Sequence, residues 1–155
     1  MGTRAVTLVI DQTWDKANTS PLINMYKLSD GYPSGYGAAL ATFLAGIVVV
    51  NGVGGGETPG EVANGAGCLA AQLVAHFKGE AGVGEVYLNN PNRPFDALIN
   101  DGDDCVYAVY TDVDLQAPEN RRVRVEYYSW GKLKFRGYVD EFAAFVNNPD
   151  ADNED

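Results

Sequence analysis

Six stretches of the chain alternate apolar and polar residues with the two-residue period of β-strands. The predicted strands cover residues 5–10, 22–28, 83–88, 105–112, 121–128 and 133–139. The fifth alternates most clearly, because Val123, Val125 and Tyr127 share one face. The first is rich in Val, Leu and Ile throughout, which is typical of a central strand. We expect it to form a hairpin with the second strand.

Three other stretches carry apolar residues three or four positions apart, as amphipathic helices do. Leu40, Phe43 and Ile47 form such a stripe in the first, and the second covers roughly residues 65–78. A short third helix is expected to begin at Asp140. The resulting order, β-β-α-α-β-β-β-β-α, predicts an α+β fold with a mostly antiparallel sheet and helices packed on one face.

Polar segments between these elements are predicted to be loops. Residues 51–60 hold five glycines, and residues 89–104 hold two prolines and four aspartates. A chain of 155 residues has the usual size of one domain, so we expect a single α+β domain over residues 1–147. Residues 148–155 are acidic, and we predict that they form a disordered tail.

The chain is strongly acidic, since 21 Asp and Glu residues against 11 Lys and Arg residues give a formal net charge of −10. This charge argues against a general nucleic-acid-binding protein, which needs basic surface to displace counterions. It also disfavours membranes, and the longest apolar run, residues 38–50, is too short to cross a bilayer. A cationic protein partner is compatible with such a surface. No signal peptide precedes the first strand, so we expect a cytoplasmic protein, in the host cytoplasm if it is viral.

The connection between the second strand and the first helix is the first candidate ligand site. Its glycines and proline turn the chain toward a helix N-terminus, where free N–H groups and the helix dipole attract an anion. Lys27 ends the strand, Ser34 is placed to cap the helix, and Asp30 can accept hydrogen bonds from a base or sugar. Tyr32 and Tyr36 would stack on a ring. The alternative is that the glycines and proline serve the turn alone.

This connection resembles part of a family of small bacterial and phage proteins that open with Met-Gly-Thr-Arg and carry an Asp-Gly-Tyr-Pro-x-Gly-His-Gly motif. The likeness rests on residues 1–4, 25–27, 30–37, 51–52 and 69–78. Lys27 stands where the family has arginine, and Tyr36 stands where it has histidine, which argues against acid–base chemistry here. The family implies no established activity, although a phage origin would favour an anti-defence role by analogy.

The basic hairpin of the last two strands is the second candidate site. Residues 121–136 carry six of the eleven cations and one acid, so this stretch is +5 while the rest of the chain is −15. Cations interleaved with tyrosines can hold phosphates and stack bases. The cations expected on this surface are Arg122, Arg124, Lys132, Lys134 and Arg136, and all but Lys132 are assigned to ligand binding. Alternatively, they pair with Asp112, Asp114 or a second subunit of a homo-oligomer, or protect the sheet edge from aggregation.

Several chemistries are excluded by what the chain lacks. His76 is the only histidine, so neither a histidine pair nor a His-rich zinc site can form within one chain. We interpret His76 as a residue that interacts with the dipole at a helix C-terminus. The acidic residues 100–104 do not fit an EF-hand, and the glycines of residues 52–56 do not open a helix as a dinucleotide fingerprint requires. We therefore predict no metal site and no cofactor.

These observations favour a non-enzymatic binding protein that captures a small anionic, nucleotide-like ligand. Two alternatives stay open. One is an acidic inhibitor that engages a cationic protein by charge mimicry. The other is a hydrolase that uses a pair of carboxylates. The residues assigned to ligand binding are Lys27, Asp30, Tyr32, Ser34, Tyr36, Arg122, Arg124, Lys134 and Arg136.

Overall fold

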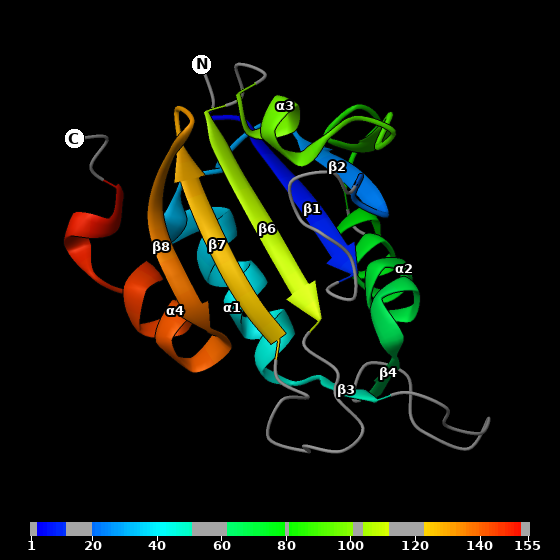
Figure 1. Ribbon diagram of the computed structural model, residues 1–155. Coiled ribbons are helices and arrows are strands. Elements are labelled where there is room, and N and C mark those ends of the chain that lie inside the picture. Colours follow the sequence, from blue (N-terminus) through cyan, green and yellow to red (C-terminus); the bar gives the residue numbers. More distant parts are fainter. Residues whose placement is uncertain are drawn as a thin grey trace.

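A computed structural model describes residues 3–11, 20–50, 62–79, 81–100, 104–111 and 123–152 of the chain (Figure 1). Six strands form one sheet in the order β5-β2-β1-β6-β7-β8. These strands are β1 (Ala5–Asp11), β2 (Ile23–Lys27), β5 (Val86–Asn89), β6 (Cys105–Thr111), β7 (Val123–Ser129) and β8 (Lys132–Tyr138). Two short strands, β3 (Val48–Val50) and β4 (Val62–Asn64), form a separate parallel pair.

Strands β1 and β6 lie side by side at the centre of the sheet and run parallel. The other neighbours in this sheet pair antiparallel, which confirms the predicted α+β class with a mostly antiparallel sheet. Every residue of β6 is buried, as are all residues of β1 except Asp11. The weak alternation of the first strand follows from this position, because a strand covered on both faces needs apolar residues on both.

Four α-helices are described, and they divide between the two faces of the sheet. They are α1 (Ala38–Ala45), α2 (Gly65–Lys78), α3 (Phe95–Ile99) and α4 (Val139–Val146). The first two and α4 pack on the face that carries Ala5, Val9 and Val109. The short helix α3 packs on the other face, against Leu8 and Val106. The prediction of helices on one face is therefore right for the three longer helices, and α3 is an addition on the opposite side.

Two segments that we expected to be irregular contain short helices. Helix α3 forms within residues 89–104 because Phe95, Leu98 and Ile99 bury their side chains at helical spacing. Near the C-terminus, η3 (Pro149–Asp152) is one turn of 3-10 helix with Ala151 buried at 7% exposure. The expected disordered tail thus differs from the structure over these four residues, and residues 153–155 lie outside the described part.

None of the helices in the described residues is both long and apolar enough to cross a membrane.

Candidate functional site

The candidate residues that follow β2 do not share one site. Lys27 ends β2 on the same face as buried Met25, since the two are separated by one residue, and this face is covered by α2. Asp30 lies in the following turn with a φ of 59°, and its carboxylate accepts a hydrogen bond from the Tyr32 hydroxyl at 3.4 Å. The Tyr32 side chain borders a different pocket from the one that Lys27 lines. The structure therefore separates Lys27 from Tyr32.

The helix N-terminus expected to receive an external anion contacts a carboxylate of the chain itself. Here η1 (Pro33–Gly37), a turn of π-helix, runs into α1, and its N-cap residue is Tyr32 rather than Ser34. The Ser34 backbone N–H donates to Asp152 Oδ1 at 2.9 Å, and its hydroxyl donates to Asp152 Oδ2 at 2.6 Å. The prediction that Ser34 caps the helix is wrong, because its hydroxyl instead holds η3 against η1.

Tyr36 is part of the core, with 2% of its surface exposed, so its ring is not accessible for stacking on a ligand. Its hydroxyl lies 2.5 Å from the Thr7 hydroxyl, and its ring contacts Phe77 and Tyr107 edge-on. Burial raises the pKa of Tyr36, and the hydrogen bond with Thr7 opposes that rise. The structure thus corrects the assignment of Tyr36: it anchors η1 to β1.

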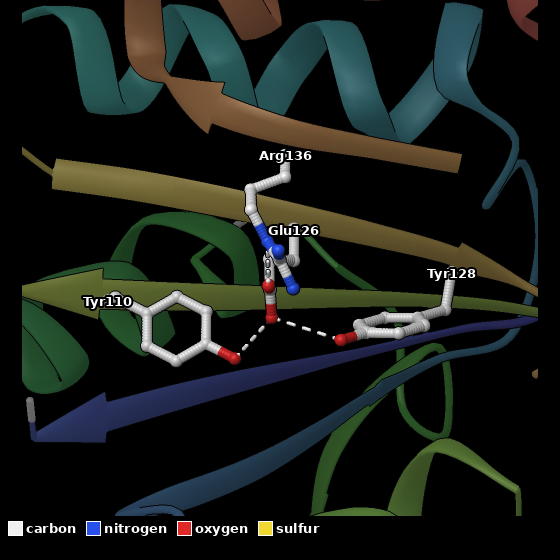
Figure 2. A network of polar contacts seen from close by, with 4 residues as sticks. All are labelled: Tyr110, Glu126, Tyr128 and Arg136. Atoms are coloured by element: carbon white, nitrogen blue, oxygen red, sulfur yellow. Dashed lines mark hydrogen bonds and ion pairs between the residues drawn. The ribbon is translucent and has the colours of Figure 1, made fainter. Parts of the chain in front are cut away.

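Arg136 of the basic hairpin is engaged by an acid of the neighbouring strand (Figure 2). Glu126 is 3% exposed, and its Oε2 accepts a hydrogen bond from Arg136 Nε at 2.6 Å. Its Oε1 accepts hydrogen bonds from the hydroxyls of Tyr110 at 2.5 Å and Tyr128 at 3.0 Å. The hydrogen bond and charge of Glu126 raise the pKa of Arg136, while burial and then Glu126 raise the pKa values of both tyrosines. Arg136 thus pairs with Glu126 of the same hairpin, whereas Asp112 and Asp114, the acids expected as partners, lie outside the described residues.

The other hairpin cations are placed differently. Arg124 is half-buried opposite Tyr138, Lys134 falls at a register shift between β7 and β8, and Arg122 lies outside the described residues. Arg124 and Arg136 lie on the face that α3 covers, because Arg124 alternates with Glu126 along β7. The sheet therefore stands between these two arginines and Lys27, and they cannot hold the same small ligand.

Lys27 lines a cleft of about 420 Å³ between the C-terminal end of α2 and strands β2 and β5. The other described residues that line it are His76, Phe77, Ala81, Glu85 and Val86. β2 and β5 place Lys27 beside Val86, its partner in the strand register. Helix α2 contributes His76 and Phe77, and Phe77 packs against the edge of buried Tyr36. The rigid core thus positions an ammonium, an imidazole and an aromatic ring around one opening.

The polar side chains in and beside this cleft differ in the hydrogen bonds and ion pairs that they already make. In the described part of the chain, no hydrogen bond or ion pair engages the side chain of Lys27, and His76 makes ring contacts alone, with Phe43 and Phe77. By contrast, Lys78 donates to the Val86 carbonyl at 2.7 Å. Glu85, the acid of the cleft, accepts a hydrogen bond from the Gly82 backbone N–H at 3.1 Å. The lysine and imidazole therefore have donor capacity left for a ligand.

Our sequence reasoning missed His76 and Phe77 as cleft residues. Phe77 belongs to the apolar stripe that starts at Leu69, and His76 precedes it at the last turn of α2, where we assigned it to the helix dipole. Two neighbouring ring side chains at the predicted end of a helix were the signal available in the sequence. The signal does not identify Lys27 as their neighbour, because that contact requires the pairing of β2 with β5.

Comparison with known proteins adds no template for this cleft. No protein-family model, no curated protein and no solved structure matches the chain. The resemblance to small bacterial and phage proteins stays a prediction, and the function of the cleft has to be inferred from its own chemistry.

Proposed function

We propose that the protein binds a small anionic, nucleotide-like ligand in the cleft between α2, β2 and β5. The observation that carries this proposal is the placement of Lys27, whose ammonium lines the cleft and has no polar partner among the described residues. Among the described residues Lys27 makes no ion pair, even with Glu85 of the same cleft, so its ammonium is available to an external anion.

The size and lining of the cleft suit such a ligand. A volume of about 420 Å³ falls within the usual range for small-molecule sites, roughly 300–1,000 Å³. Lys27 would hold a phosphate or carboxylate as a point charge, and the His76 imidazole would add a donor. The Phe77 ring, or the His76 ring, which lies tilted against Phe43, would receive a base or another flat group.

Binding is better supported than hydrolysis at this site. Glu85 is the one carboxylate among the described residues that line the cleft, whereas hydrolysis of a glycosidic bond by acids needs two. If the chain comes from a phage, capture of a nucleotide would also fit an anti-defence role, which rests on the resemblance described above.

Isothermal titration calorimetry with adenosine monophosphate, inorganic pyrophosphate and adenosine tests the proposal. We expect adenosine monophosphate to bind at least tenfold more tightly than adenosine, because a charge-assisted hydrogen bond contributes about 1.5–3 kcal/mol. Lys27→Gln should reduce the affinity for adenosine monophosphate by about 10- to 100-fold on the same scale. Pyrophosphate should bind the wild-type protein, and Lys27→Gln should weaken that binding.

The matched control is Lys132→Gln, which removes the same charge from an exposed position at the start of β8, away from the cleft. Circular dichroism of both variants would show that the fold is retained. Equal binding of adenosine and adenosine monophosphate would contradict the proposal. Equal losses in Lys27→Gln and Lys132→Gln would do so as well, since they would indicate a general charge effect.

A further inference from the structure

A second pocket, of about 280 Å³, lies at the end of the sheet where β6 begins and β7 ends. Its described lining includes the carboxylates of Asp104 and Asp152 and the aromatic rings of Tyr32, Tyr127 and Trp130. It shares no described residue with the cleft of Lys27. The two sites can therefore be tested separately.

Both carboxylates of this pocket are held in place by hydrogen bonds from the chain. Asp152 accepts its hydrogen bonds from the neutral backbone and hydroxyl groups of Ser34. Asp104 accepts a hydrogen bond from the Arg4 backbone N–H at 3.0 Å, and its Oδ1 also forms an ion pair at 3.8 Å with the Arg4 guanidinium, whose 45% exposure leaves this pair screened by water. No lysine, arginine or histidine is among the described lining residues. The pocket is therefore positioned to attract a cation.

Trp130 gives the pocket an aromatic wall that lies largely on the surface. It is 55% exposed, and it occupies the β7–β8 turn with a φ of 50°, followed by Gly131 with a φ of 81°. Such turns favour Asn or Gly, and a bulky residue in this backbone conformation costs about 1 kcal/mol. Tyr32, at 37% exposure, stands at the same pocket. Two large exposed rings beside fixed carboxylates match the way proteins bind organic cations.

We propose that this pocket binds an alkylammonium group, which Asp104 and Asp152 attract and which the faces of Tyr32 and Trp130 contact. The volume corresponds to about nine water molecules, which leaves room for a short aliphatic chain behind the ammonium. A metal ion fits this site less well, because within the described ranges no group of three or more His, Cys, Asp or Glu side chains is arranged to hold one. A free amine and a lysine side chain of another protein share this chemistry.

Tryptophan fluorescence provides the assay. The chain has two tryptophans, so a Trp14→Phe variant leaves Trp130 as the reporter beside the pocket. We expect a saturable change in fluorescence with n-butylammonium and with an Nα-acetyl-lysine amide. The neutral isostere n-butanol should give none. Tighter binding of the lysine derivative would indicate that the natural ligand is a lysine side chain of another protein. Tighter binding of n-butylammonium would indicate a free amine. Either result supports the site.

Asp104→Asn, made in the Trp14→Phe background, should weaken n-butylammonium binding about tenfold, the loss expected for one charge-assisted contact. Asp150→Asn is the control, because it removes the same charge from exposed η3 and does not line the pocket. Three results with the Trp14→Phe variant would overturn the proposal: no change in fluorescence with n-butylammonium, an equal change with n-butanol, or an equal change with Ca²⁺. An equal loss in both Asp variants would also overturn it.

Discussion

Removal of the Arg136 charge tests whether the Glu126 network stabilises the fold. Arg136→Met leaves the buried Glu126 carboxylate with the two tyrosine hydroxyls as its remaining hydrogen-bond partners in this network. Removing one member of a fully buried ion pair costs about 3–5 kcal/mol. The Arg136 side chain is 62% exposed, however, so water can replace part of its interaction. We therefore expect a loss of about 1–2 kcal/mol in the free energy of unfolding.

The two oxygens of Glu126 allow a sharper comparison. Both tyrosines donate to Oε1 and Arg136 donates to Oε2, so Glu126→Gln can keep the tyrosine bonds while its amide N–H₂ meets another donor. Glu126→Leu removes every acceptor and leaves two buried hydroxyls without this partner. We expect Glu126→Leu to be less stable than Glu126→Gln by about 2 kcal/mol or more, because each unsatisfied buried hydroxyl costs about 1–3 kcal/mol.

Urea denaturation followed by circular dichroism would measure these free energies, provided the slopes with denaturant agree among the variants. In the double variant with Glu126→Gln and Arg136→Met, the losses should fall short of their sum by about 1 kcal/mol, since both single substitutions break the same contact. Additive losses in this cycle, or equal stabilities of Glu126→Gln and Glu126→Leu, would refute the reasoning.

Three further predictions follow from the packing and the buried tyrosines. Gly31→Ala should lower the free energy of unfolding by about 2 kcal/mol, because the added Cβ would lie 2.7 Å from the Cβ of Ala5. Gly67→Ala, in open space on α2, should raise the free energy of unfolding by about 0.5–1 kcal/mol. Urea denaturation would measure both changes, and equal effects would contradict the packing argument. Ser34→Ala should speed hydrogen exchange in η3 by removing the hydroxyl contact with Asp152, and unchanged exchange would argue against that contact as an anchor. The free energy of unfolding should fall steeply above pH 10, because five tyrosines have raised pKa values in the fold and ionise at lower pH in the unfolded chain. Each of them adds a slope of about 1.4 kcal/mol per pH unit. Absorbance at 295 nm and circular dichroism should change together, and tyrosine ionisation without unfolding would contradict this prediction.

The spacing of apolar residues predicted the helices that bury one regular apolar stripe. The helix expected over roughly residues 65–78 is α2 (Gly65–Lys78), because Leu69, Leu73 and Phe77 repeat every four residues. Helix α3 was missed because its five residues lie in a stretch dominated by Asn, Asp and Pro. Pro94 before it and Asp96 in its first turn were the local signals of a helix start.

Contacts between distant segments could not be predicted from such patterns. Ser34 looks like a helix cap, and its partner Asp152 is 118 residues away. The basic hairpin looks like one cationic surface, but the acceptor for Arg136 is the single acid within it, and the sheet separates it from Lys27. Lys27 lines a cleft with His76 and Phe77 rather than with the other predicted site residues, because strand pairing decides which side chains meet.

The central claim, that an anion binds beside Lys27, can be tested at His76. Because this is the only histidine in the chain, its imidazole signals in ¹H–¹⁵N NMR spectra are assigned without ambiguity. During a titration with inorganic pyrophosphate at constant pH and ionic strength, these signals should shift saturably in the wild type and far less in Lys27→Gln. Imidazole signals that stay unchanged while signals elsewhere in the protein move would place the anion at another site and contradict the account.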